Sequence, residues 1–228
     1  MVRWGTSDVI ILMKVLFIYP KYPETFWSFK HALKIINKKA AYPPLGLLTV
    51  AAMLPDKWEK KLVDMNVSRL KDKDIDWADY IFISAMIVQR ESTEELILKC
   101  KSQGKKIAAG GPLFIMEPEK YKEIDHLILG EAEIVLKDFL KDLEKGTAKK
   151  IYKADKLPDL TQTPIPLWSL IKPRKYASMN IQYSRGCPYD CEFCNITSLY
   201  GRLPRTKEPD QILEELNALY KNKWRRSI

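Results

Sequence analysis

The stretch Lys14-Val15-Leu16-Phe17-Ile18-Tyr19 decides the fold, because it is the first of five short apolar runs that alternate with amphipathic segments. The other four runs cover residues 61–64, 80–85, 106–109 and 126–129. Apolar residues recur at helical spacing in segments between or after these runs, at 45–54, 93–102 and 131–144. Strands that alternate with helices imply right-handed crossovers and a parallel, doubly wound sheet. The sequence therefore predicts an α/β domain over residues 13–150, preceded by an extension at 1–12 that has no role in the fold.

Unusual residues fall where these apolar runs end. The carboxyl ends of parallel strands meet at one edge of a doubly wound sheet, and ligands bind in the crevice beyond that edge. Glycines at such positions let a ligand approach the backbone closely. The candidate ligand-edge residues are Tyr42, Leu45, Gly46, Ser84, Met86, Gly110, Gly111, Gly130 and Glu131. No glycine-rich phosphate fingerprint follows the first run, so the pattern disfavours a nicotinamide or flavin dinucleotide.

Composition bounds the class of protein. A chain of 228 residues with 46% hydrophobic residues can build one large domain or two small ones. The net charge is +9, but the lysines are scattered beside acidic residues, as in Lys137-Asp138, which favours a solvated surface over nucleic-acid binding. No segment reaches the ~18 apolar residues of a transmembrane helix. Three of the four cysteines crowd together, which argues against a disulfide framework and predicts a cytoplasmic protein in a reducing compartment.

Those three cysteines lie in Ser184-Arg185-Gly186-Cys187-Pro188-Tyr189-Asp190-Cys191-Glu192-Phe193-Cys194, at the spacing C-x3-C-x2-C. Soft thiolates select zinc or an iron–sulfur cluster. A structural zinc site takes four protein ligands, and no histidine or fourth cysteine follows this loop. Three thiolates on a four-iron cluster leave one iron open to a substrate or cofactor. A partial zinc knuckle or a disulfide-rich loop stays the alternative, and Cys100, in an amphipathic segment, is interpreted as a buried structural thiol.

At Cys187, Cys191, Phe193 and Cys194 the sequence resembles the radical S-adenosylmethionine (SAM) superfamily, whose cluster loop is C-x3-C-x-aromatic-C. The resemblance implies a 4Fe-4S cluster on the three cysteines, with SAM on the open iron and Phe193 packed near the adenine of SAM. It also implies a reducing electron donor, such as flavodoxin or ferredoxin, and release of a 5′-deoxyadenosyl radical.

The first half of the chain resembles the cobalamin-binding domain that precedes the catalytic barrel in one branch of this superfamily. The motifs that carry the resemblance are Tyr42-Pro43-Pro44-Leu45-Gly46-Leu47-Leu48, Val63-Asp64-Met65-Asn66, Ala109-Gly110-Gly111-Pro112 and Leu129-Gly130-Glu131-Ala132-Glu133. They imply a Rossmann-like fold with cobalamin against the nine ligand-edge residues. The chain lacks the Asp-x-His-x-x-Gly motif that supplies a cobalt ligand in many cobalamin proteins. We therefore expect neither His31 nor His126 on cobalt, and we expect residues 88–90 under the corrin ring.

The remainder of the chain predicts a linker and the start of a second domain. Prolines at 158, 164, 166 and 173 mark a surface linker over residues 151–177. Residues 178–183 alternate as a strand, the cysteine loop follows, and Pro209 begins a helix. These parts make the first β/α unit of an incomplete radical SAM, TIM-like barrel, so residues 178–228 are interpreted as a truncated radical SAM domain. We expect its helix to expose an apolar face made of Ile212, Leu213, Leu216 and Leu219.

The motifs together predict a cobalamin-dependent radical SAM enzyme, specifically a methyltransferase that acts on an unactivated carbon and is inactive as this chain alone. The stretches 191–196 and 201–207 are similar to the branch that contains the hopanoid methylases, which implies a small-molecule or lipid substrate. The sequence identifies no catalytic residue. Two alternatives are a non-catalytic module that binds cobalamin and an iron–sulfur cluster, and a radical SAM enzyme that modifies tRNA. The tRNA alternative is weakened because no appended RNA-binding domain is visible.

Overall fold

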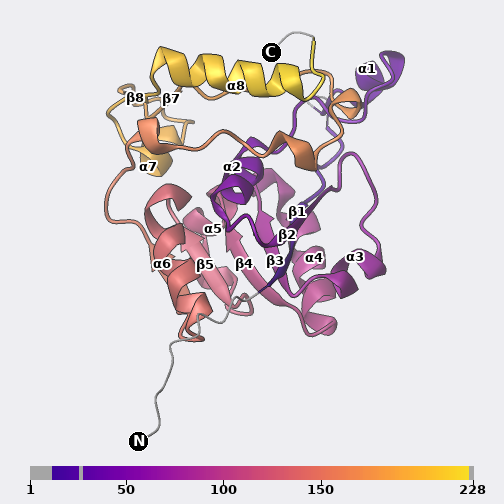
Figure 1. The fold of residues 1–228 in the computed structure, drawn as a ribbon, viewed down its shortest axis with the longest axis vertical. Helices are drawn as coiled ribbons and strands as arrows, with labels where there is room; N and C mark the ends of the chain where they lie inside the picture. The colour runs from indigo at the N-terminus through magenta and orange to yellow at the C-terminus, as the bar shows by residue number, and fades with distance from the viewer. Residues whose placement is uncertain (1–11, 26–27, 226–228) are drawn as a thin grey trace, which may run out of the picture.

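A six-stranded parallel sheet forms the centre of the molecule (Figure 1). The computed structural model describes residues 12–25 and 28–225. The strands are β1 (Lys14–Tyr19), β2 (Glu59–Asp64), β3 (Tyr80–Ser84), β4 (Lys106–Gly110), β5 (His126–Leu129) and β6 (Ile151–Lys153). Their order in the sheet is β2-β1-β3-β4-β5-β6, so the winding direction reverses between β1 and β3. The prediction of a parallel, doubly wound sheet is confirmed, and the switch point between β1 and β3 is where such sheets bind ligands.

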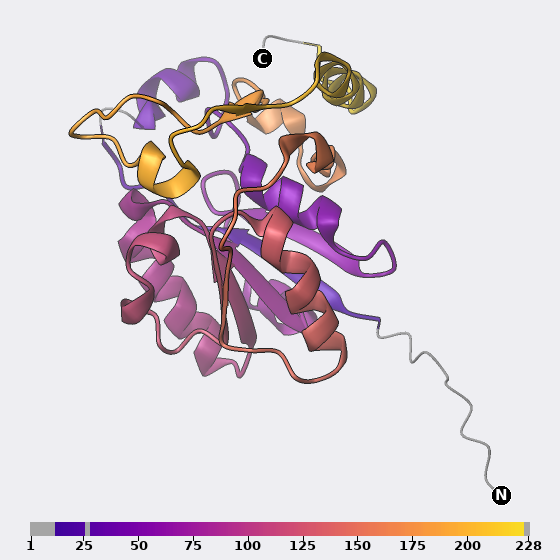
Figure 2. The ribbon, with the colours of Figure 1, turned by 90° about the vertical axis from the view of Figure 1, so that its left-hand side faces the viewer.

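Helices cover both faces of the sheet, which Figure 2 shows nearly edge-on. α2 (Leu45–Met53) and α6 (Ala132–Glu144) pack with Val15 and Phe17 of β1 on one face. α3 (Asp72–Trp77), α4 (Arg90–Ser102) and α5 (Pro112–Met116) pack with Leu16 and Ile18 on the other. Successive side chains of a strand point to opposite faces, so a strand covered on both sides must be apolar throughout. This burial explains why the sequence shows continuous apolar runs.

The sixth strand lies beyond residue 150, in the range that the sequence assigned to the linker. β6 pairs in parallel with β5, and the Ala154 N–H donates to the Leu129 carbonyl directly after it. Only Tyr152 of its three residues is buried, since β6 is an edge strand. A single buried side chain gives no periodic signal, which is why the sequence does not predict it. The sheet therefore extends three residues past the expected boundary at 150.

After β6 the chain crosses the carboxyl edge of the sheet. It forms β7 (Ser184–Arg185), α7 (Ile196–Tyr200), β8 (Arg205–Thr206) and α8 (Pro209–Lys221), with β7 and β8 paired antiparallel. The predicted helix start at Pro209 is confirmed. The strand predicted at 178–183 is wrong, because these residues form no strand in the described chain. Their alternation has another cause: Met179 is fully buried and Ile181 partly buried against the aromatic residues of the preceding linker.

α8 lies over a third apolar cluster that joins the two parts of the chain. Leu219 of α8 and Trp224 pack with Trp168 and Tyr176 of the linker and with Leu48 of α2. The expectation that the helix exposes its whole apolar face is therefore wrong: Leu219 is 1% exposed, Ile212 and Leu216 are half-buried, and Leu213 alone is exposed. The linker covers most of this face of α8. The sequence prediction treats α8 as part of a barrel unit and does not include the linker in its packing.

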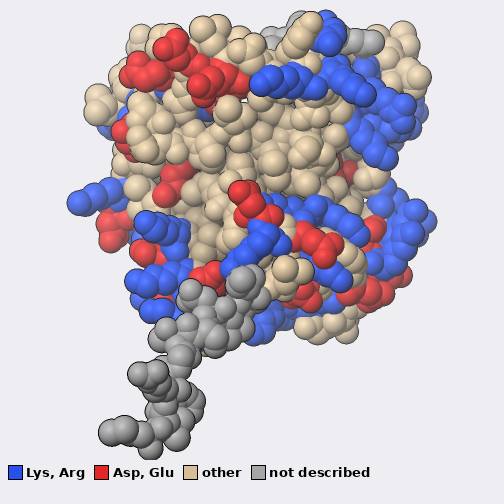
Figure 3. Space-filling view, in the orientation of Figure 1, with Lys and Arg blue, Asp and Glu red and all other residues tan. Residues whose placement is uncertain are grey.

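Charged side chains of both signs are mixed over the sheet domain on the face seen in Figure 3, in agreement with a solvated surface. Along α8 the signs separate, with Asp210 in the first turn and Lys221 in the last. That order stabilises a helix, whose dipole places partial positive charge at its amino end. No helix of the described residues is long and apolar enough to cross a membrane.

Candidate functional site

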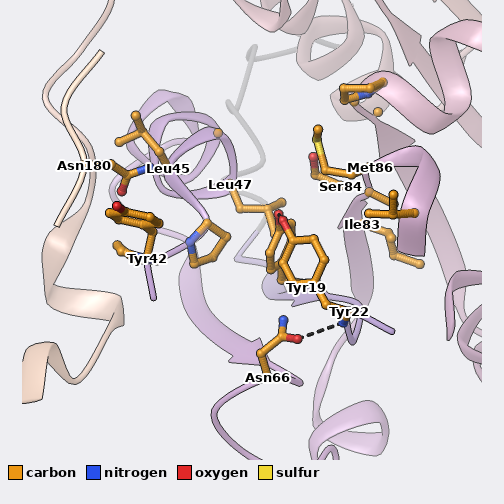
Figure 4. A pocket seen from close by; sticks show the side chains of 18 of the residues that line it. Tyr19, Tyr22, Tyr42, Leu45, Leu47, Asn66, Ile83, Ser84, Met86 and Asn180 are labelled. Carbon is orange, nitrogen blue, oxygen red and sulfur yellow. Dashed lines mark hydrogen bonds between the residues drawn. The ribbon is translucent and has the colours of Figure 1, made fainter. Parts of the chain in front are cut away.

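A cavity of about 1180 Å³ lies at the carboxyl edge of the sheet. The strand ends of β1, β3, β4 and β5 and the start of α2 form one side, and residues of the segment 180–200 form the other. All nine candidate ligand-edge residues line it: Tyr42, Leu45, Gly46, Ser84, Met86, Gly110, Gly111, Gly130 and Glu131. Figure 4 shows how side chains from the separate elements converge, with Tyr42 beside Asn180. The topology thus gathers residues that are spread over 90 positions of the sequence, from 42 to 131.

Two cavity glycines differ in what the backbone requires of them. Gly111, between β4 and α5, has φ 94° and ψ 175°, a region that is essentially restricted to glycine. A Cβ atom there would lie 2.7 Å from Ser84 Oγ and 3.1 Å from the Ala85 carbonyl oxygen. Gly46 lies in the first turn of α2, and a Cβ atom added to it would meet no atom within 4 Å. Of these two glycines, only Gly111 therefore depends on being glycine.

We expect the two alanine variants to change stability in opposite directions. Gly111→Ala should lower the free energy of unfolding by about 1–3 kcal/mol, because alanine must adopt the strained backbone region. Gly46→Ala should raise it by about 0.5–1 kcal/mol, because alanine reduces the entropy of the unfolded chain within a helix. Urea denaturation followed by circular dichroism measures both. Equal shifts for the two variants would contradict the backbone assignment.

Two tyrosines, Tyr19 half-buried and Tyr22 exposed at its rim, form part of one wall of the cavity. The Tyr19 and Tyr22 hydroxyl oxygens lie 2.6 Å apart, and the Tyr22 backbone N–H donates to Asn66 Oδ1 at 2.8 Å. Burial raises the pKa of both tyrosines above the usual value, and the mutual contact adds to the rise at Tyr19. Both phenols therefore stay neutral, and they offer aromatic faces and hydrogen bonds without charge. The opposite wall carries Asn180, whose buried Oδ1 has no hydrogen-bond partner within the described residues.

Neither histidine lines the cavity. His126 lies at the amino end of β5, where its ring stacks on Tyr80 and its Nδ1 is 2.5 Å from the Lys149 carbonyl oxygen. His31 is exposed on α1 (Lys30–Ile35). The predicted placement of His126 away from the ligand edge is confirmed.

The stretch 88–90 contributes less to the cavity than expected. Val88 lines the cavity and is exposed. Gln89 is buried and turns inward, where it donates to the Pro20 carbonyl oxygen at 2.6 Å and accepts from the Met86 N–H at 2.8 Å. Arg90 pairs with Glu117 and does not line the cavity. Of the three residues, only Val88 can therefore contact a ligand in the cavity.

The three loop cysteines are free thiols, and none of them lines the cavity, although Asn195, directly after Cys194, does. Cys187 is half-buried and donates its backbone N–H to the Gly201 carbonyl at 3.1 Å, while Cys191, Phe193 and Cys194 are exposed. No three His, Cys, Asp or Glu side chains of the described residues lie close enough together to hold a metal ion. The cluster assignment therefore stays a prediction. Cys100 is fully buried in α4, and burial raises its pKa to about 12, as expected for a structural thiol.

Glu131 makes contacts that the sequence does not reveal. Its Oε2 accepts from Arg185 at 2.6 Å, and its Oε1 accepts from Arg205 at 2.6 Å. Arg185 also pairs with Glu133 at 2.8 Å. Burial raises the pKa of Glu133, but its bonds with Arg185 outweigh burial and hold the pKa below the usual value. Glu131 therefore lines the cavity with a carboxylate that already pairs with two arginines, and its contact with a cofactor stays a prediction. The basic residues at 201–206 indicate in the sequence that cations are available there, but they do not indicate that Arg205 pairs with Glu131.

Comparison with known proteins agrees with this geometry. Residues 34–140 match the model of the B12-binding domain. The chain is 49% identical over 218 residues to the uncharacterised methyltransferase sll1242 of Synechocystis, a match that covers 95% of this chain and 41% of the relative. It is 36% identical over 211 residues to the hopanoid C-2 methylase of Rhodopseudomonas palustris, with 90% and 40% covered.

The fold is also found in a solved structure. The radical SAM methyltransferase TsrM from Kitasatospora setae, with cobalamin and a 4Fe-4S cluster bound, superposes with a TM-score of 0.61 at 14% identity. That match covers 93% of this chain and 46% of TsrM. The chain spans about two fifths of the length of the curated relatives described above. Residues 34–140 are therefore a B12-binding domain, and the chain as a whole is similar to relatives that are named as methyltransferases, among them a hopanoid methylase.

Proposed function

We propose that the protein is a cobalamin-dependent radical SAM methyltransferase that acts on an unactivated carbon, and that this chain holds its cofactors. The observation that carries the proposal is that one cavity joins the two halves of the chain. The strand ends of the B12-binding domain line it, and so do Asn195, Ile196 and Tyr200, which closely follow Cys194. A group held by the cysteine loop would thereby lie beside a group held at the sheet edge.

The cavity fits a corrin in size and chemistry. Its volume of about 1180 Å³ exceeds the ~300–1,000 Å³ of ordinary ligand pockets, as a cofactor of this size requires. Gly110, Gly111 and Gly130 leave the backbone open at the sheet edge. The neutral Tyr19–Tyr22 pair and the unpartnered Asn180 Oδ1 suit a ligand that is rich in amide groups. The first strand is not followed by a glycine-rich phosphate motif that would favour a dinucleotide, and neither histidine lines the cavity.

The cysteine loop fits an iron–sulfur cluster by its donor set. Cys187, Cys191 and Cys194 supply three soft thiols, and the fourth cysteine is buried in α4. Three donors suit a cluster with one open iron better than a closed zinc site. When bound, cobalamin supplies the methyl group, and the reduced cluster with SAM supplies the radical that activates the substrate. Phe193 is exposed beside the last two cysteines and is available to pack against the adenine of SAM.

The substrate and the electron donor belong to the proposal. The relative named hopanoid C-2 methylase favours a lipid or another apolar small molecule as the substrate. The reduction of the cluster requires a donor such as flavodoxin or ferredoxin. The relatives reported above are named as methyltransferases or as a methylase, and none of their names indicates a nucleic acid.

We expect the chain 1–228 to bind hydroxocobalamin with a visible spectrum that lacks histidine coordination. Neither histidine lines the cavity, so His31→Ala and His126→Ala should leave the spectrum of the bound corrinoid unchanged. Titration followed by absorbance measures the affinity and the coordination together. Because His126 packs on Tyr80 and Phe139, its variant needs a circular dichroism check of folding. Absence of binding, or a spectral change in either folded variant, would reject this part of the proposal.

A further inference from the structure

We propose that Glu131 is a positioning residue for the cysteine loop: through Arg185 and Arg205 it fixes the backbone that enters Cys187 against the end of β5. This inference rests on the proposed function in one respect: that the cysteine loop binds a cluster. The contacts themselves are made by the chain alone, so they can be tested without any bound group.

The register of the small sheet presents two arginines to one carboxylate. Arg185 in β7 lies directly opposite Arg205 in β8. Arg185 contacts Oε2 of Glu131, and Arg205 contacts both oxygens, at 2.6 Å to Oε1 and 3.2 Å to Oε2. The side chains of Arg185, Arg205 and Glu131 are 11%, 14% and 3% exposed, respectively. Paired, buried, charge-assisted hydrogen bonds of this kind fix both position and direction.

The same arginines hold both ends of the cysteine loop. Arg185 is followed by Gly186, with φ 93°, and then by Cys187. Arg205 donates to the Tyr200 carbonyl oxygen at 3.0 Å and to the Pro158 carbonyl oxygen at 2.9 Å. The Cys187 N–H donates to Gly201, the neighbour of Tyr200, at 3.1 Å. The chain therefore enters and leaves the loop beside one cluster of ion pairs, in which Glu131 is the sheet-domain residue that contacts both arginines.

Two other ion pairs near the loop do not bring Arg185 and Arg205 together. Arg202 and Asp190 pair at 2.9 Å, but both side chains are more than half exposed, and such pairs contribute little. Glu133 pairs with Arg185 and shares its carboxylate with Thr163. Neutralising Glu131 instead leaves the buried Arg205 without the carboxylate it pairs with, and leaves Arg185 with Glu133 alone, which is unfavourable for a buried charge.

The test measures the alkylation rate of each cysteine in the metal-free, reduced chain 1–228, kept anaerobic. Pulses of N-ethylmaleimide followed by peptide mass spectrometry report Cys187, Cys191, Cys194 and Cys100 separately. In Glu131→Gln we expect Cys187 to react about tenfold faster relative to Cys191, because release of the anchor raises the population of locally open loop. Asp190→Asn, which breaks the exposed pair in the same loop, should change the ratio less than about twofold.

Cys100 serves as the internal control, because it is fully buried in the sheet domain and reacts only when that domain opens. A faster Cys187 with an unchanged Cys100 supports the proposal. An unchanged Cys187, or a Cys187 and a Cys100 that accelerate together, overturns it. Arg205→Met tests the other partner and should also accelerate Cys187, because it removes the bonds to Glu131, Tyr200 and Pro158 together. The double variant should accelerate Cys187 by less than the product of the two single effects. Failure of the chain to bind iron would overturn the proposed function and leave this measurement intact.

Discussion

Cys191→Ala is expected to abolish cluster formation in this chain. After anaerobic reconstitution with iron and sulfide, the parent chain should hold about four irons, as a 4Fe-4S cluster requires. The loop supplies three free thiols, and Cys191 is the exposed middle one. Two remaining thiolates cannot hold the cluster, so the variant should lose its iron and the broad visible absorption together.

The matched control for this measurement is Cys100→Ala. Cys100 is fully buried in α4 with a raised pKa, so its removal should leave the iron content unchanged, provided that the variant stays folded. Iron and zinc are quantified by elemental analysis and the cluster by absorbance and electron paramagnetic resonance. Undiminished iron in Cys191→Ala, or one tightly bound zinc in the parent chain, would reject the iron–sulfur assignment.

Much of the fold follows from the sequence because burial on two faces leaves a simple pattern. β1, β3, β4 and β5 are covered by helices on both sides, and each reads as an apolar run that ends in a turn. The ligand edge follows from topology alone, since the carboxyl ends of parallel strands meet there. That is why residues as far apart as Tyr42 and Glu131 can be assigned to one cavity from the sequence.

Elements that depend on distant partners cannot be predicted in this way. β6 has one buried residue, and β7 and β8 have two residues each, so none of them shows the alternation of apolar and polar residues that predicts a strand. Their positions come from pairing and from the ion pairs at Glu131, whose partners lie 54 and 74 residues away. The sequence places Glu131 at the ligand edge but does not reveal its arginine partners, because a carboxylate at a strand end suits a ligand as well as an arginine.

The second large effect is expected at a buried ion pair under α8. Lys207 and Glu215 pair with side chains that are 4% and 0% exposed. Glu215 Oε2 has no hydrogen-bond partner among the residues that the structure describes. Burial raises the pKa of Glu215, and Lys207 opposes that rise without cancelling it. The pair therefore compensates only part of the free energy that its desolvation costs.

A double-mutant cycle separates the pair from its surroundings. Lys207→Met or Glu215→Leu alone should lower the free energy of unfolding by about 3–5 kcal/mol, because each leaves one uncompensated buried charge. The double variant should be as stable as the parent or more stable, by up to about 4 kcal/mol, because both charges are replaced by apolar groups of similar size. The exposed pair of Lys30 and Glu24 provides the control, and Glu24→Gln should leave the unfolding midpoint unchanged.

Urea denaturation gives the global free energies, and hydrogen exchange of peptides from α8 shows where the stability is lost. Gln211, one turn before Glu215, donates to the Leu160 and Thr163 carbonyl oxygens of the linker, and Leu219, one turn after it, packs in the cluster with Trp168. A single unpaired charge at Glu215 or Lys207 should therefore release α8 from the linker first and leave α2 protected. A double variant less stable than the parent would show that the pair is a net source of stability and that its desolvation has been overestimated. Single variants that are each as stable as the parent would show that neither charge is costly to leave unpaired.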